Sequence, residues 1–165
     1  MHNERHSFMG AGRGWGVLLV LAWAAAAAAA SNVNSTNRWA YGANLGWIDG
    51  RADGTNGAAI GEFVCSNYLW AANVGWIHLG NGQPTNGWQY GNATATDYGV
   101  NHDGLGNLRG YAWGANIGWV AFESNGAPRV DLRSGQLSGS AWGANVGWIG
   151  LSNAFGSVRI DRLEF

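Results

Sequence analysis

The most informative part of the sequence is Tyr111-Ala112-Trp113-Gly114-Ala115-Asn116-Ile117-Gly118-Trp119-Val120, because its pattern occurs four times. The other three copies are Ala40-Tyr41-Gly42-Ala43-Asn44-Leu45-Gly46-Trp47-Ile48, Leu69-Trp70-Ala71-Ala72-Asn73-Val74-Gly75-Trp76-Ile77 and Ala141-Trp142-Gly143-Ala144-Asn145-Val146-Gly147-Trp148-Ile149. Internal self-similarity is the signature of a repeat architecture, and it outranks any single-residue motif in a fold prediction. We therefore expect one structural unit that is repeated along the chain.

Each copy predicts a β-hairpin, because aromatic and β-branched residues flank a Gly-Ala-Asn or Ala-Ala-Asn triplet that suits a short loop. After Gly, Asn best tolerates the left-handed backbone that a three-residue hairpin loop needs at its last position. The predicted turn residues are Asn44, Asn73, Asn116 and Asn145. In this register Trp113 faces Ile117 and Tyr111 faces Trp119, whereas a loop one residue shorter redistributes the rings.

The motif tryptophans are expected to pack in the core, because large aromatic side chains favour burial. Eight tryptophans in or beside the motifs represent roughly 1,200 to 2,000 Å² of surface, far more than the apolar patch of a soluble monomer. The predicted repeat core comprises Trp47, Trp70, Trp76, Trp113, Trp119, Trp142 and Trp148. The alternative is that some of these rings are platforms for a ligand.

Residues 1–30 have the composition of a secretory signal peptide. Arg5 and Arg13 give a basic start, and the fourteen residues from Val17 to Ala30 form an apolar run that ends in three alanines. Such a segment is removed on export, with cleavage expected after Ala30. The run is shorter than the roughly 20 residues of a membrane-spanning helix, so we expect no membrane span after cleavage.

The mature chain, residues 31–165, is predicted to be a single domain in the periplasm, at the cell surface or outside the cell. It contains one cysteine, Cys65, and therefore no intramolecular disulfide. Seven arginines and nine carboxylates give it a formal net charge of −2, and it has no lysine. Nucleic-acid and anionic-membrane binders need a basic stripe, so the composition argues against both partner classes.

The units can be delimited from the spacing of the second tryptophan in each motif, which is 29, 43 and 29 residues. One further short strand precedes the hairpin in the third and fourth units, which predicts units of three strands in a β-meander. The four units lie near residues 35–50, 58–80, 98–123 and 129–151.

The two ends of the mature chain complement each other. The first unit begins at its hairpin, and residues 157–165 at the other end begin with a match to the first strand of the fourth unit. We therefore predict an all-β fold in which this terminal strand closes a propeller-like or barrel-like ring. The alternative is that the strand completes a neighbouring molecule, which leads to self-association as a fibre.

The longer spacing contains an insertion at residues 80–97, and loops of this length are often functional. Trp88, Gln89 and Tyr90 combine stacking rings with an amide, which suits a sugar face and its hydroxyls. They are the candidate ligand-binding residues. The alternative is an extra hairpin that caps the sheet.

The chain contains no strong catalytic signature, and neither a metal site nor a cofactor is predicted. Residues 49–57 resemble a calcium loop only faintly, and His78 and His102 stand in different units. The carboxylates that could pair in a glycosidase are expected in solvated turns. They are Asp49, Asp53, Glu62, Glu123 and Asp131. We therefore predict that the protein is not an enzyme.

The units resemble the Gly-Tyr-Ala-Trp-x-x-Asn-x-Gly-Trp-Ile repeats of secreted and cell-surface proteins in environmental bacteria, which are often found beside carboxy-terminal sorting tags. The resemblance covers nearly all of the mature chain. Residues 111–120 fit the motif throughout, and the second copy departs from it at Leu69 and Ala71. The resemblance implies an extracellular bacterial setting and no particular activity.

The leading functional prediction is an exported, non-enzymatic repeat protein of the cell envelope or extracellular matrix, acting as a structural or surface-interaction module. The expected partners are glycans or other envelope proteins. A lectin-like carbohydrate-binding module is the first alternative. The second is a small outer-membrane β-barrel, suggested by Phe165 and the aromatic-rich strands, although roughly six or seven residues per strand fall short of the ~9 to 11 that a membrane strand needs.

Overall fold

The computed structural model describes residues 30–161. The predicted signal peptide, apart from Ala30, and residues 162–165 of the predicted closing strand lie outside this range. The strands of the described part are β1 (Val33–Gly42), β2 (Gly46–Asp49), β3 (Ala59–Ile60), β4 (Cys65–Ala71), β5 (Gly75–Asn81), β6 (Val100–His102), β7 (Leu108–Gly114), β8 (Gly118–Phe122), β9 (Arg129–Val130), β10 (Leu137–Ser138), β11 (Ser140–Gly143), β12 (Gly147–Gly150) and β13 (Val158–Ile160). Residues 30–161 include no helix with the length and apolar character needed to cross a membrane.

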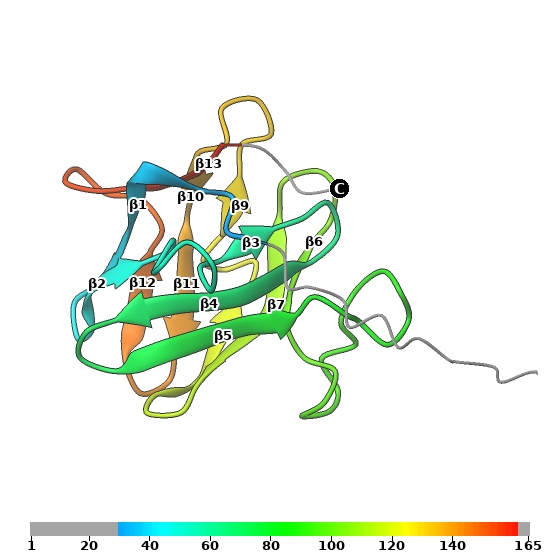
Figure 1. The fold of residues 1–165 in the computed structure, drawn as a ribbon. Coiled ribbons are helices and arrows are strands. Elements are labelled where there is room, and N and C mark those ends of the chain that lie inside the picture. The colour runs from blue at the N-terminus through cyan, green and yellow to red at the C-terminus, as the bar shows by residue number, and fades with distance from the viewer. Residues whose placement is uncertain (1–29, 162–165) are drawn as a thin grey trace, which may run out of the picture.

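Eight of these strands form a closed antiparallel barrel, in the order β1-β2-β4-β5-β7-β8-β11-β12 (Figure 1). The ring is completed by β12 and β1, where Tyr41 pairs with Gly150 and Gly42 with Ile149. The prediction of a closed all-β fold is thus confirmed. Closure pairs the backbone groups that an open sheet would leave free at its two edges.

The remaining strands extend the barrel strands at one end. β3 pairs with β4, β6 with β7, and β9 with β10, which leads directly into β11. The terminal strand β13 pairs with β1 of the same chain, with Val33 opposite Ile160 and Arg38 opposite Val158. The last strand therefore supplies the neighbour that the first hairpin lacks in sequence.

Each motif forms a hairpin, but its loop lies one residue later than predicted. In the third hairpin Trp113 pairs with Trp119 and Gly114 with Gly118, so the loop is residues 115–117. The left-handed backbone belongs to the glycine after the loop, as in Gly118 with φ of 76°. Glycine adopts this conformation without the steric cost that any Cβ atom imposes, and it forms the bulge that ends a three-residue loop. The four asparagines are turn residues, as predicted, but none is left-handed.

The shift changes which residues pair across the hairpin, but Tyr111, Trp113 and Trp119 share one face in both registers. The structure differs from the prediction in that the opposite face points into the barrel. The barrel interior therefore holds small and branched side chains, such as Ala112 opposite Val120 and Ala40 opposite Ile48. The motif tryptophans lie on the outside, so the prediction that they form the core is wrong. An interior enclosed by eight short strands is filled by modest side chains, and it has no room for a ring from every strand.

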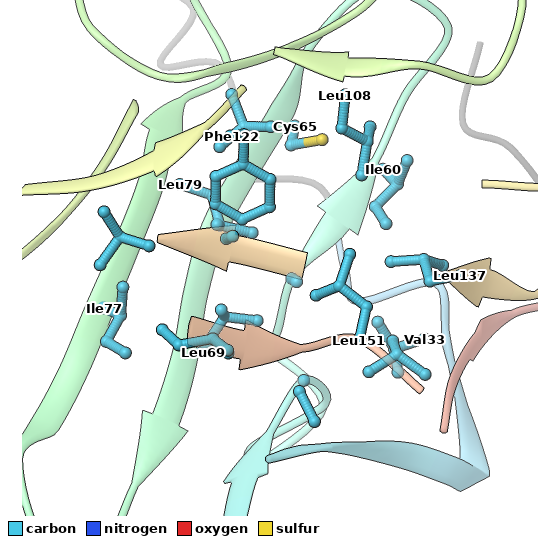
Figure 2. Close-up of a pocket in the computed structure, with 18 residues that line it drawn as sticks. Val33, Ile60, Cys65, Leu69, Ile77, Leu79, Leu108, Phe122, Leu137 and Leu151 are labelled. Atoms are coloured by element: carbon cyan, nitrogen blue, oxygen red, sulfur yellow. The ribbon is translucent and has the colours of Figure 1, made fainter. Parts of the chain in front are cut away.

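The hairpin end of the barrel is sealed by the apolar residue of each loop. Leu45, Ile117 and Val146 are buried there, and Val74 packs against the core. Gly114 leaves the necessary space, because a Cβ atom in its place would lie 2.7 Å from the Ile117 side chain. Further along the axis, Leu79, Phe122 and Leu151 point into a cavity of about 40 Å³ (Figure 2). The interior is thus a packed apolar core.

Candidate binding surface

The outer face of the barrel carries one pair of aromatic rings on each hairpin. The pairs are Tyr41–Trp47, Trp70–Trp76, Trp113–Trp119 and Trp142–Trp148, with ring centroids 5.1, 4.8, 4.7 and 5.0 Å apart. All four meet edge to face, which is a favoured arrangement of aromatic rings. Each pair stands directly across the hairpin, one step from the glycine that ends the loop. We call these eight rings the aromatic belt.

The belt is exposed to an unusual degree for such large apolar groups. Its side chains remain 38–46% exposed, because the partner ring and the neighbouring strand cover only part of each. At roughly 150 to 250 Å² per ring, this leaves on the order of 500 to 800 Å² of aromatic surface in solvent. Large exposed apolar areas in soluble proteins mark interaction sites. The belt is therefore the strongest candidate for a binding surface in the described residues.

Three further rings join the second and third hairpins into one aromatic surface. Tyr68 lies 5.7 Å from Trp76 and 4.8 Å from His78, measured between ring centroids. Tyr98 follows the insertion and lies 5.5 Å from His78 and 4.9 Å from Trp119. The Tyr98 hydroxyl is also 2.7 Å from Nδ1 of His78. Partial burial lowers the pKa of His78, which favours the neutral ring.

Three hollows open on this outer surface, and each includes the second tryptophan of a hairpin. Cleft 1, of about 320 Å³, is lined by Trp39, Trp47 and Phe155. Cleft 2, of about 340 Å³, is lined by Asn56, Tyr68 and Trp76. Cleft 3, of about 430 Å³, is lined by Tyr98, Tyr111, Trp119 and the loop of residues 92–95.

The three clefts occupy equivalent positions. One wall is the aromatic residue two positions before the first ring of the hairpin, which is Trp39, Tyr68 or Tyr111. The opposite wall comes from a loop outside the hairpin. In the fourth hairpin the residue two positions before the first ring is Ser140. This hairpin therefore has the same ring pair without the aromatic wall.

The motif asparagines form a closed ring of hydrogen bonds around the hairpin end of the barrel. Each Nδ2 donates to the backbone carbonyl of the apolar residue in the preceding loop, and the first loop donates to the fourth. Asn44 donates to Val146 at 3.2 Å, Asn73 to Leu45 at 2.9 Å, Asn116 to Val74 at 3.0 Å and Asn145 to Ile117 at 3.0 Å. Their amides thus link neighbouring hairpins. The sequence signal of this role was that asparagine stands at the same position in all four motif copies.

The predicted ligand-binding residues of the insertion do not converge. Trp88 is 63% exposed and meets the edge of Phe63 at 5.1 Å. Gln89 donates from Nε2 to the carbonyl of His102 at 3.1 Å. Tyr90 is only 4% exposed, so its predicted role as a stacking platform is wrong.

Tyr90 instead anchors the insertion to the barrel. Its hydroxyl donates to the Cys65 carbonyl at 2.9 Å and accepts from the Gly82 amide at 2.7 Å. Its ring fills space that Gly80 and Gly99 leave open, since a Cβ atom on either glycine would lie within 2.5 Å of it. Burial raises the pKa of the Tyr90 hydroxyl to about 12 and that of the Cys65 thiol to about 12. Both groups are therefore neutral at physiological pH.

Three of the five carboxylates considered for catalysis stabilise turns or an ion pair. Asp49 accepts from the amides of Arg51 and Ala52 and pairs with Arg38. Asp53 accepts from the amides of residues 55 and 56, and the bond from residue 56 lowers its pKa most. Asp131 likewise accepts from the amides of residues 133 and 134, which lowers its pKa.

His78 and His102, the two histidines considered above as metal ligands, also form hydrogen bonds within the fold. His102 is fully buried, with Nδ1 3.0 Å from the Gly61 carbonyl, and its Nε2 accepts from the Gly106 amide at 3.1 Å. Over residues 30–161, no cluster of three or more His, Cys, Asp or Glu side chains has the arrangement of a metal site.

Comparison of the chain with protein-family models, with curated proteins and with solved structures gives no match.

Proposed function

We propose that this protein is an exported, non-enzymatic module of the cell envelope or extracellular matrix, and that it acts by binding through its aromatic belt. One observation carries the proposal: the largest apolar side chains of the repeat lie on the outer face and remain about two-fifths exposed. Burial of these rings would stabilise the domain, so their placement outside favours a role in contact with another molecule.

The rigid strands that carry the aromatic belt also favour a role in binding. Each ring pair stands on two paired strands of a closed barrel, and the asparagine ring ties the four hairpins together. A surface held in one conformation loses little entropy when it binds. Aromatic side chains with few rotatable bonds add to this advantage.

The proposal that the protein is not an enzyme is supported by the use of its polar side chains. Asp49, Asp53 and Asp131 are occupied by turn amides or an ion pair, and His102 is bonded on both ring nitrogens. A catalytic acid or base must be within reach of its substrate. These groups are instead committed to the backbone.

A membrane-spanning barrel is the less favoured alternative. The barrel strands other than β1 contain four to seven residues, whereas a membrane strand needs ~9 to 11. His78 and Ser140 also stand on the outward positions of these strands. We expect the mature chain to be recovered without detergent, and extraction by detergent alone would overturn this interpretation.

The test is co-sedimentation of the mature chain with isolated envelope and matrix material of the source organism. The double substitution Trp76→Ala and Trp119→Ala removes two exposed rings, and we expect it to weaken binding about tenfold or more, as for other aromatic hot spots. Leu132→Ala is the matched control, because Leu132 is 49% exposed but lies outside the belt. Equal binding by both variants, each folded by circular dichroism, would contradict the proposal.

A further inference from the structure

We propose that the ligand is a neutral polysaccharide, that clefts 1, 2 and 3 each bind a sugar unit of it, and that one molecule bridges two polysaccharide chains. This inference rests on the proposed function, since it assigns a ligand to the same outer surface. Three observations carry it: the chemistry of the cleft walls, their lack of charge and their placement around the barrel.

The cleft walls combine the two features that a sugar requires. A sugar ring presents an apolar C–H face and a rim of hydroxyls, so its site needs a flat ring and nearby hydrogen-bonding groups. In cleft 3, Trp119 and Tyr111 supply the ring faces, and Asn92 and Thr94 lie beside them. In cleft 2, Tyr68 and Trp76 stand beside Asn56. A hollow of roughly 300 to 400 Å³ is at the lower end of the range for small-molecule sites.

The charge of the clefts selects a neutral ligand. None of the residues that line the three clefts is an arginine or a carboxylate. The guanidinium of Arg38 lies 5.2 Å from the ring centre of Trp39 in cleft 1, and it is paired with Asp49. Anionic polymers such as nucleic acids need several cationic contacts. The residues that line the clefts therefore present no charge of their own to an uncharged chain.

The placement of the clefts supports bridging. Clefts 1, 2 and 3 lie on the consecutive hairpins β1–β2, β4–β5 and β7–β8. In the closed order of eight strands, β1–β2 and β7–β8 lie across the barrel from each other (Figure 1). Clefts 1 and 3 therefore face away from each other and engage different chains. Several sites on one polymer also raise the overall affinity well above that of a single site.

The fourth hairpin provides a control within the same molecule. Its rings Trp142 and Trp148 have the same edge-to-face geometry, but Ser140 stands where the other hairpins have an aromatic wall. We therefore assign no sugar site to this hairpin, and Trp148→Ala is the comparison variant for the cleft tryptophans.

The experiment measures binding of the mature chain to a panel of neutral polysaccharides, namely cellulose, chitin, β-1,3-glucan, mannan and dextran, with alginate and polygalacturonate as anionic controls. We expect at least one neutral polymer to bind and the anionic ones not to bind. Trp119→Ala and Trp47→Ala should each lower the affinity several-fold, and Trp148→Ala should lower it less than either. Leu132→Ala, which lies outside the belt, should change the affinity less than about twofold. Tyr111→Ser, which copies the fourth hairpin, is a milder variant should a tryptophan change unfold the protein.

Bridging is measured separately, as the turbidity of a solution of the bound polysaccharide. The wild-type protein should precipitate it, and the double variant Trp47→Ala with Trp119→Ala should still bind through cleft 2 but no longer precipitate it. Binding to anionic polymers only, or an equal loss in Trp148→Ala and Trp119→Ala, would overturn the inference.

The same measurements separate this inference from the proposed function. If no neutral polymer binds but envelope co-sedimentation still depends on Trp76 and Trp119, the sugar assignment fails and the belt binds a protein or lipid instead. If envelope co-sedimentation is also independent of the belt, the proposed function fails as well.

Discussion

The inner and outer faces of the barrel are built from alternate residues of the same strands, yet they use opposite kinds of side chain. On β7 and β8 the inner pair is Ala112 and Val120, and the outer pair is Trp113 and Trp119. The other hairpins repeat this division, with Leu69 in place of the inner alanine in the second. The repeat thus assigns its largest rings to the surface. Packing inside and contact with other molecules outside are separate tasks of one motif.

The largest expected effect is the loss of stability when a bulky side chain is placed on the inner face, compared with the same change on the outer face. Ala112→Phe adds a ring to a closed interior whose free volume is only about 40 Å³. Overpacking typically lowers the free energy of unfolding by about 1–3 kcal/mol, and we expect this variant to lie at or above the upper end of that range. Ala121→Phe, on the outer face between Tyr111 and Trp142, adds a ring in solvent and should change stability by less than about 0.5 kcal/mol. Urea denaturation measures both.

This pair of variants tests directly which face of the sheet points into the barrel. If the rings faced inward, as the sequence predicted, Ala121 would be the buried position and the order of the two effects would be reversed. An Ala112→Phe protein as stable as the wild type would contradict the inward position of Ala112.

The faces meet at the hairpin loops, where a smaller effect is expected. Asn73→Ala removes the hydrogen bond to the Leu45 carbonyl, and the loss of one such bond costs about 1 kcal/mol. Asn145→Ala breaks the bond to Ile117 in a different pair of loops, so the two losses should add. The free energy of unfolding from urea titrations checks this.

The asparagine substitutions also separate the stability of the interior from binding by the outer face. Each amide holds a loop whose apolar residue seals the interior, whereas the belt rings lie on the strands below. Asn73→Ala should therefore leave binding of the belt to envelope material within about twofold. A change in stability below about 0.3 kcal/mol would show that the ring of hydrogen bonds contributes little.

Much of the fold could be predicted from local patterns. Four motif copies gave four hairpins, and the match between the last strand and the fourth unit indicated the pairing of β13 with β1. The register could not be predicted, because Asn116 and Gly118 are both able to adopt a left-handed backbone. Gly118 takes that conformation in preference to Asn116. The period of two puts the motif rings on one face in either register, but which face points into the barrel depends on how the closed sheet is filled.

The candidate site was harder to predict than the fold. The sequence directed attention to Trp88 and Tyr90, but the hydroxyl of Tyr90 is bonded to backbone groups at Cys65 and Gly82. Backbone partners leave no trace in side-chain patterns, so this burial had no sequence signal. Tyr98 completes cleft 3 only because the insertion returns to the barrel beside Trp119. Contacts between a loop and a distant strand depend on the three-dimensional path of the chain.

The smallest expected effect is a dependence of stability on pH, and it comes from the outer face. His78 is half-buried between Tyr68 and Tyr98 and stands across from Trp113, and burial lowers its pKa below the ordinary value of 6.5. The unfolded chain therefore binds a proton at a higher pH than the folded protein. Stability is full above about pH 6.5 and falls as the pH drops towards the lowered pKa. Asp53 and Asp131, whose pKa values are lowered from 3.8, lose their contribution only in more acidic solution.

The measurement is the urea midpoint of the wild type and of His78→Gln at pH 7.5 and pH 5.0. Glutamine keeps a polar group near the Tyr98 hydroxyl but does not titrate, so this variant should lose less stability on acidification than the wild type. The difference between the two proteins belongs to His78, because the other titratable groups are common to both. A wild type that becomes more stable relative to His78→Gln at pH 5.0 would contradict the burial of a neutral imidazole. It would also show that the aromatic surface between the second and third hairpins favours a cation, which argues against a purely neutral ligand at cleft 3.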